Sequence, residues 1–181
     1  MNLSTMRIGL VGLAFLGLVA WGPSGEEPAT RDAPVRGQEG TAECRDVIIG
    51  QGPADWRRDS VIAGPAAVLK GSLNGMVREP GGTMVRKMGM MIVGREPVQV
   101  SVPAPLRKRV WLFYGRSAAS FAEDPGLKIA NFEPCADQQR SVWPGGIRIR
   151  GRKPVRLSVT VPGEKTTHIL RLGKPRVLGE G

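Results

Sequence analysis

Short runs in which apolar and polar residues alternate follow one another along most of this chain. The clearest lies at 155–161, where Val155, Leu157, Val159 and Val161 occupy every second position. Successive side chains of a β-strand point to opposite faces, so this run predicts a strand with one buried face. Runs that predict strands, several of them alternating in this way, lie at 60–63, 67–70, 85–93, 98–102, 110–114, 128–132, 147–149, 155–161 and 167–172.

The order and spacing of these runs predict an all-β fold. Turn-forming residues separate the runs at intervals of about 8 to 15 residues, a spacing typical of sandwiches and barrels. No stretch after residue 22 repeats its apolar residues with a sustained helical period. We predict an antiparallel, immunoglobulin-like β-sandwich of seven to nine strands over residues 44–172, followed by a C-terminal tail at 173–181. An open barrel is the competing interpretation.

The N-terminal segment 1–21 has the pattern of an export signal. Arg7 precedes an unbroken apolar run at 8–21, and Glu26, Glu27 and Asp32 follow it. This order of charges predicts that the body lies outside the cytoplasm, either secreted or anchored to the membrane by this segment. A helix of 14 residues spans roughly 21 Å, less than the roughly 30 Å of the hydrocarbon core. Length therefore favours a cleaved signal peptide, with an uncleaved signal anchor as the alternative.

A linker is predicted at 22–43. This segment is rich in Gly, Pro, Glu, Ala and Thr, and Val35 is its only large aliphatic residue. It therefore offers too little apolar surface to offset the entropy lost on folding. We expect a flexible stalk with a root-mean-square reach of roughly 26 Å.

Cys44 and Cys135 are the only cysteines of the chain. Disulfides persist in the compartments that exported proteins enter, so we expect these two residues to be joined. The disulfide would close a loop of about 90 residues, which in the chain-entropy model stabilises the folded domain by about 4 to 5 kcal/mol. Two separate buried thiols are the alternative.

Three segments in the second half of the chain resemble a known sequence pattern. They are Asn131-Phe132-Glu133-Pro134-Cys135, Trp143-Pro144-Gly145-Gly146-Ile147 and Val155-Arg156-Leu157-Ser158-Val159. This order of a Phe-x-x-Cys segment, a Trp-x-Gly-Gly segment and an alternating strand resembles uncharacterised exported β-sandwich proteins of high-GC Gram-positive (actinobacterial) bacteria. The resemblance implies an exported β-domain and carries no catalytic residues. Physically, the Gly-Gly pair allows either a positive φ or a close backbone approach at a bulge.

Candidate catalytic chemistry is sparse in a chain of 181 residues with one histidine. His168 lies between Thr167 and Ile169 in a predicted strand, where an ordinary strand residue is the simpler interpretation. Once the cysteines are paired, too few ligands remain for a zinc site of the usual His and Cys composition. We therefore expect no enzyme activity and no cofactor. A secreted hydrolase that uses His168 is the third hypothesis for function.

Methionines provide the second hypothesis. Met84, Met88 and Met90 share one face of the predicted strand at 85–93 and its approach, and Met91 points the other way. Exported thioether clusters bind Cu(I), so an extracytoplasmic copper-binding protein is the alternative function. Methionine is also an adaptable filler of hydrophobic cores, which is the structural interpretation of the same residues.

Basic residues are the last feature, since 26 Lys and Arg against 16 Asp and Glu give a net charge of +10. Five cations cluster late in the chain: Arg148, Arg150, Arg152, Lys153 and Arg156. Arg148, Arg150 and Arg152 occupy alternate positions opposite Ile147 and Ile149, so their side chains are expected to face solvent. Outside the cell such a patch suits anionic lipid headgroups or wall polymers. Export and the few aromatic residues disfavour nucleic acid.

Together these observations favour a non-catalytic module of the cell envelope. We expect it to act in binding or as a scaffold, with an anionic envelope polymer, a lipid surface or an envelope protein as partner. The structural alternative for the cationic cluster is a solvated strand edge that charge protects from aggregation.

Overall fold

The computed structural model describes residues 38–48, 54–69, 73–120 and 124–179. Strands dominate this part of the chain, which confirms the predicted all-β class. Its helical structure consists of one short α-helix, α1 (Trp56–Asp59), and 3-10 turns at Cys44–Asp46, Ala104–Leu106 and Gly115–Ser120. The predicted signal segment at 1–21 and residues 22–37 of the predicted linker lie outside the described residues.

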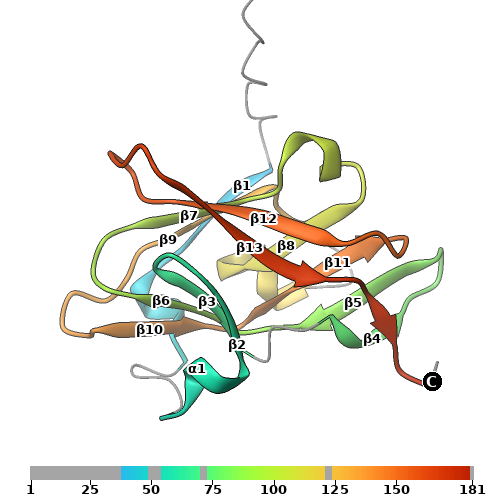
Figure 1. Ribbon diagram of the computed structural model, residues 1–181, viewed down its shortest axis with the longest axis horizontal. Helices are drawn as coiled ribbons and strands as arrows, with labels where there is room; N and C mark the ends of the chain where they lie inside the picture. Colours follow the sequence, from blue (N-terminus) through green and yellow to red (C-terminus); the bar gives the residue numbers. More distant parts are fainter. Residues whose placement is uncertain (1–37, 49–53, 70–72, 121–123, 180–181) are drawn as a thin grey trace, which may run out of the picture. The chain divides into compact units, whose positions relative to one another are not determined.

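The strands form three hydrogen-bonded sheets (Figure 1). The first contains, in spatial order, β1 (Glu39–Ala42), β9 (Ile129–Phe132), β7 (Val98–Ser101), β12 (Val155–Thr160) and β13 (Thr167–Gly173). The second contains β10 (Arg140–Trp143), β6 (Met90–Val93), β3 (Ala66–Leu69) and β2 (Ser60–Ala63). The third contains β14 (Arg176–Val177), β4 (Asn74–Arg78), β5 (Thr83–Lys87), β11 (Gly145–Arg150) and β8 (Val110–Tyr114).

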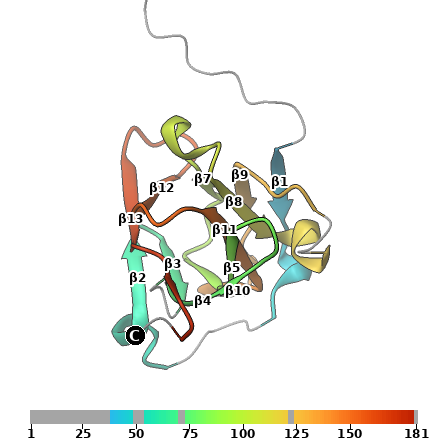
Figure 2. The same ribbon diagram turned by 90° about the vertical axis from the view of Figure 1, so that its right-hand side faces the viewer.

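The second and third sheets are two halves of one bent layer. Residues 83–87 of β5 pair with 146–150 of β11, and residues 90–93 of β6 pair with 140–143 of β10. Both sets of pairs belong to the same antiparallel register, and the N–H of Met88 donates to the carbonyl oxygen of Gly145 at 2.8 Å between them. The ladder therefore passes through the bend without a slip. This bent layer packs against the first sheet in a sandwich-like arrangement, with β13 beside β2 (Figure 2).

Gly145 lies at the bend of this ladder. A Cβ atom at this position would collide with the carbonyl oxygen of Phe113 and with the ring of Tyr114 on β8. Its φ lies outside the left-handed region, so close approach of the neighbouring strand is what requires glycine here. The sequence allowed either a positive φ or a close backbone approach at the Gly-Gly pair, and Gly145 shows the close approach.

One hydrophobic core lies between the two layers. Val155, Leu157 and Val159 of β12 are buried on one side of this core, as their alternation predicted. Ile147 and Ile149 of β11 are buried in it from the bent layer. The buried faces of these two strands were therefore predicted correctly from the period of two residues.

The topology differs from the predicted purely antiparallel sandwich of seven to nine strands. The described residues form fourteen strands, and the pairs β1–β9 and β14–β4 are parallel. β1, β4, β10 and β14 were not predicted, because none of them contains a sustained apolar alternation. Hydrogen bonding to a neighbouring strand, rather than local residue preference, places such short segments in a sheet.

Two boundaries also change. β1 lies within the segment 22–43 that was predicted as a linker, and β14 lies within the tail predicted at 173–181. Each is short and pairs in parallel at the edge of its sheet. The folded part therefore begins before Cys44 and continues past residue 172.

Candidate functional site

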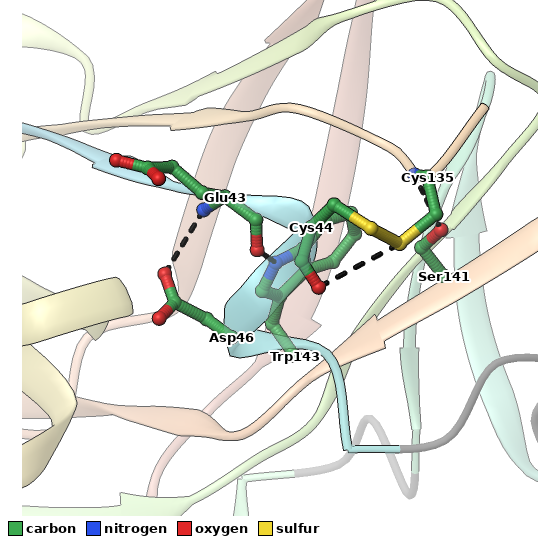
Figure 3. Close-up of a disulfide and its surroundings, with 6 residues drawn as sticks. All are labelled: Glu43, Cys44, Asp46, Cys135, Ser141 and Trp143. Carbon is green, nitrogen blue, oxygen red and sulfur yellow. Dashed lines mark hydrogen bonds between the residues drawn. A yellow bond between two sulfur atoms is a disulfide. The ribbon is translucent and has the colours of Figure 1, made fainter.

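The predicted disulfide between Cys44 and Cys135 is present, and it joins residues 91 positions apart (Figure 3). Cys135 is buried, and its backbone N–H donates to Oγ of Ser141 at 3.1 Å. The indole N–H of Trp143 donates to the carbonyl oxygen of Glu43 at 2.8 Å, next to Cys44 (Figure 3). The disulfide thus holds the entry to the body against the segment between β9 and β10, which is a structural role.

The methionines of the copper hypothesis lie in the core. Met84, Met88 and Met90 are at most 4% exposed and belong to the main core, together with Met76. Met91 lies in a separate cluster with Trp56. The described residues contain no group of three or more His, Cys, Asp or Glu side chains that could hold a metal ion. The methionine positions are those of core-packing residues.

His168 lies on β13 opposite Val159 and is partly exposed. Its ring is so close to Gly64, in the turn between β2 and β3, that a Cβ atom on that glycine would collide with it. The structure therefore places His168 where the edge of the first sheet meets the bent layer.

The outer face of β4, β5, β11 and β8 carries the candidate site. Cross-strand register places Val77, Val85, Arg148 and Trp111 in one row across these four strands. A pocket of about 480 Å³ opens on this face, within the range of roughly 300 to 1,000 Å³ typical of ligand sites. Its lining consists of Glu79, Pro80, Thr83, Trp111, Pro125, Arg148 and Arg150.

Arg148 is one of the residues that line this pocket, and the prediction that it faces solvent needs correction. Its side chain is 14% exposed, and its Nε donates to Oε2 of Glu79 at 2.9 Å. Its Nη1 donates to the carbonyl oxygen of Asp124 at 3.3 Å, and the guanidinium lies 4.8 Å from the ring centroid of Phe113. Glu79, whose Oε2 also accepts from Thr83 at 3.0 Å, could not be paired with Arg148 from sequence because 69 positions separate them.

Arg150 is the exposed cation of the pocket. Its guanidinium lies 5.8 Å from the ring centroid of the partly exposed Trp111. Among the described residues, its side chain has no ion pair or hydrogen bond. A guanidinium beside an aromatic ring presents a planar set of donors next to an apolar surface. Trp111 was not predicted as a site residue, although its place on the outward face of the strand at 110–114 was a signal.

The loop after β11 is held in place by a third arginine. Arg109 donates from Nη1 to the carbonyl oxygen of Arg150 at 3.2 Å, and from Nη2 to those of Lys153 and Pro154 at 2.6 and 3.0 Å. Burial lowers the pKa of Arg109 from its ordinary value. The exposed residues Arg152 and Lys153 are therefore presented on a loop whose backbone is fixed beside the pocket.

Arg156, the fifth predicted cation, lies apart from the others. It is exposed on β12 of the first sheet, directly opposite Arg171 of β13. β12 and β11 belong to different layers and bury their inward side chains in the core between them. Their exposed side chains therefore project from opposite sides of the sandwich-like body. The structure thus brings Arg148 and Arg150 together at the pocket, sets Arg152 and Lys153 on the adjoining loop, and separates Arg156 from them.

Lys128 lies behind the pocket, buried against Trp111. Its Nζ donates to the carbonyl oxygen of Val110 at 2.6 Å and lies 4.1 Å from the ring centroid of Trp111. Burial, reinforced by the charge of Arg107, lowers the pKa of Lys128 to about 8. Loss of the proton from Lys128 above this pH therefore removes a positive charge that lies against the ring of Trp111.

Raising the pH from 7.5 to 9.5 is expected to increase the free energy of unfolding by about 2 kcal/mol through Lys128. Across this window the unfolded chain, with a lysine pKa of 10.5, keeps a proton that the folded chain releases as the pH rises past about 8. Urea unfolding at both pH values measures the effect. The increase should vanish in Lys128→Met and persist in the control Lys174→Met, whose lysine is exposed. An equal increase in both variants would contradict this assignment.

Comparison with known proteins yields no relative of this chain. No protein-family model matches it, and no curated protein sequence and no solved structure matches it. In the described part of the chain, no helix has the length and apolar character needed to cross a membrane. The candidate function therefore rests on the geometry of the pocket and on the properties of the sequence.

Proposed function

We propose that this protein is a non-catalytic binding module of the cell envelope, exported on an N-terminal signal segment, that binds anionic envelope polymers. The observation that carries the proposal is the pocket in which the guanidinium of the exposed Arg150 lies over the ring of Trp111. The net charge of +10 supports a polyanionic partner, because it raises the local concentration of negatively charged polymers. The disulfide supports export, since disulfides persist mainly in oxidising compartments.

The scaffold of the proposed module is a sandwich-like β-domain. Its two layers support a sandwich, and the immunoglobulin-like arrangement stays a prediction. The copper-binding and hydrolase hypotheses also stay sequence-based predictions, because no contact of Met84, Met88, Met90 or His168 favours them.

Removal of three cations beside the pocket tests the proposal. Replacing Arg150, Arg152 and Lys153 by Ser is expected to weaken binding to an immobilised polyanion about a hundredfold, since each cation near an anionic surface contributes about 1 kcal/mol. Arg148 stays in place, because its removal would leave the partly buried Glu79 without its ion pair. Polygalacturonate and poly-L-glutamate serve as probes, each at low and high salt.

A matched triple variant controls for net charge. This control replaces three exposed cations by Ser: Arg156 on β12, Lys165 in the loop after it and Arg171 on β13. It removes the same charge at a distance from the pocket. We expect only a small loss of binding in this control. Equal losses in the two variants would contradict a localised site. Failure of the unmodified chain to bind either probe at low salt would overturn the proposed function.

A further inference from the structure

We propose that the pocket on the outer face of β4, β5, β11 and β8 binds an acidic sugar unit of a polysaccharide, with the sugar ring on Trp111 and its carboxylate on Arg150. This inference rests on the proposed function and names the chemical class of its ligand. Four kinds of lining group support it, namely an aromatic ring, an exposed cation, a carboxylate with a neighbouring hydroxyl, and two prolines.

The aromatic wall suits a ring rather than a flexible acidic chain. Trp111 is partly exposed at the pocket, and Pro80 and Pro125 complete the rigid apolar lining. The face of an indole ring is electron-rich, and the C–H groups of a sugar ring carry a partial positive charge. A sugar ring can therefore pack against the exposed part of Trp111 next to Arg150, whereas an acidic side chain such as glutamate presents no comparable surface.

Arg150 supplies the site for the negative charge. Its exposed guanidinium lies 5.8 Å from the centroid of Trp111, which is within reach of a carboxylate carried by a ring stacked on that indole. A guanidinium can donate two parallel hydrogen bonds to one carboxylate, and such charge-assisted pairs are the stronger ones in proteins. The adjacent loop carries Arg152 and Lys153, which extends the positive surface to further acidic units of a polymer.

Glu79 supplies acceptors for hydroxyl groups. Its Oε2 accepts hydrogen bonds from Arg148 and Thr83, which fixes the carboxylate at the edge of the pocket. A carboxylate has about four acceptor sites on its two oxygens, so Oε1 remains suited to accept from a ligand hydroxyl. Sugars offer several such donors, and the deoxyribose-phosphate backbone of DNA offers none. This arrangement favours an acidic saccharide over a DNA strand stacked on the same ring.

Binding to four probes of matched length tests the inference on the full-length chain. The probes are polygalacturonate, poly-L-glutamate as an acid without a sugar ring, dextran as a sugar without charge, and oligothymidylate as a stacking polyanion. We expect polygalacturonate to bind most tightly. Trp111→Ala should weaken that binding about tenfold and leave poly-L-glutamate binding nearly unchanged, because only the sugar loses a stacking surface.

Two further variants keep the test independent of folding, because Trp111 also packs against Lys128. Trp111→Phe retains an aromatic face and should restore part of the affinity for polygalacturonate. Arg150→Gln changes an exposed side chain and should lower the affinity for both acidic polymers about tenfold, with Arg156→Gln, an exposed arginine on β12 away from the pocket, as the matched control. Unfolding curves confirm that each variant is folded.

The outcomes separate the inference from the proposed function. Equal binding of polygalacturonate and poly-L-glutamate, with no effect of Trp111→Ala on either, would overturn the acidic-sugar site and leave the polyanion-binding function standing. Tightest binding of oligothymidylate, lost in Trp111→Ala, would replace the sugar by a nucleic acid. Absence of binding to every charged probe would overturn the proposed function together with this site.

Discussion

Replacing Cys44 and Cys135 by Ser is expected to lower the free energy of unfolding by about 4 to 5 kcal/mol. The disulfide joins residues 91 positions apart, so in the unfolded chain it closes a loop that spans half of the protein. Removing it restores the entropy of that loop to the unfolded state, and the chain-entropy model gives the magnitude. Native proteins are typically stable by about 5 to 15 kcal/mol, so the double variant should lose a large fraction of its stability.

Urea unfolding of the unmodified chain, with and without reductant, and of the double variant measures this effect. The reduced protein and the double variant should show the same loss, because both lack the covalent closure of the loop. Mass spectrometry of the unreduced protein should find one linked peptide pair. Alkylation of both cysteines in the folded protein without reductant would contradict the disulfide and its contribution to stability.

Trp143→Ala is expected to destabilise the fold by about 3 to 5 kcal/mol, the range typical of large aromatic residues removed from a core. Trp143 is fully buried, and its ring lies 5.2 Å from that of Phe132 in an edge-to-face arrangement. Phe132 lies in turn 5.2 Å from Tyr114. Deletion of the indole therefore leaves a cavity at one end of this row of aromatic rings and also removes the hydrogen bond to the carbonyl oxygen of Glu43.

Trp143→Phe separates these two contributions, because it keeps an aromatic ring and removes only the indole N–H and part of the volume. We expect Trp143→Phe to lower the free energy of unfolding by more than a surface substitution and by less than Trp143→Ala. Urea unfolding measures this loss. Since Glu43 precedes Cys44, the effects of Trp143→Phe and of the cysteine replacements should be non-additive in a double-mutant cycle. A loss below about 1 kcal/mol for Trp143→Ala, the size of an ordinary surface substitution, would contradict a central packing role.

Local sequence determined which segments form the longer strands and which of their faces is buried. The alternation at 155–161 and at 147–149 places Val155, Leu157, Ile147 and Ile149 in the core. A period of two residues is a local property, because each strand points alternate side chains to opposite sides whatever its neighbours are. The pairing of two cysteines could likewise be predicted, because the chain has no third cysteine to compete.

Only the tertiary structure decided how these strands combine and where the candidate site lies. The ladder that bends at Gly145, the edge strands β1 and β14, and the ion pair between Arg148 and Glu79 all join segments far apart in sequence. Alternation indicates that Arg148 points outward, but it carries no information about a carboxylate 69 positions away that covers it. The pocket at Trp111 and Arg150 exists because β8 and β11 are paired in one register, and such pairing depends on the packing of the whole core.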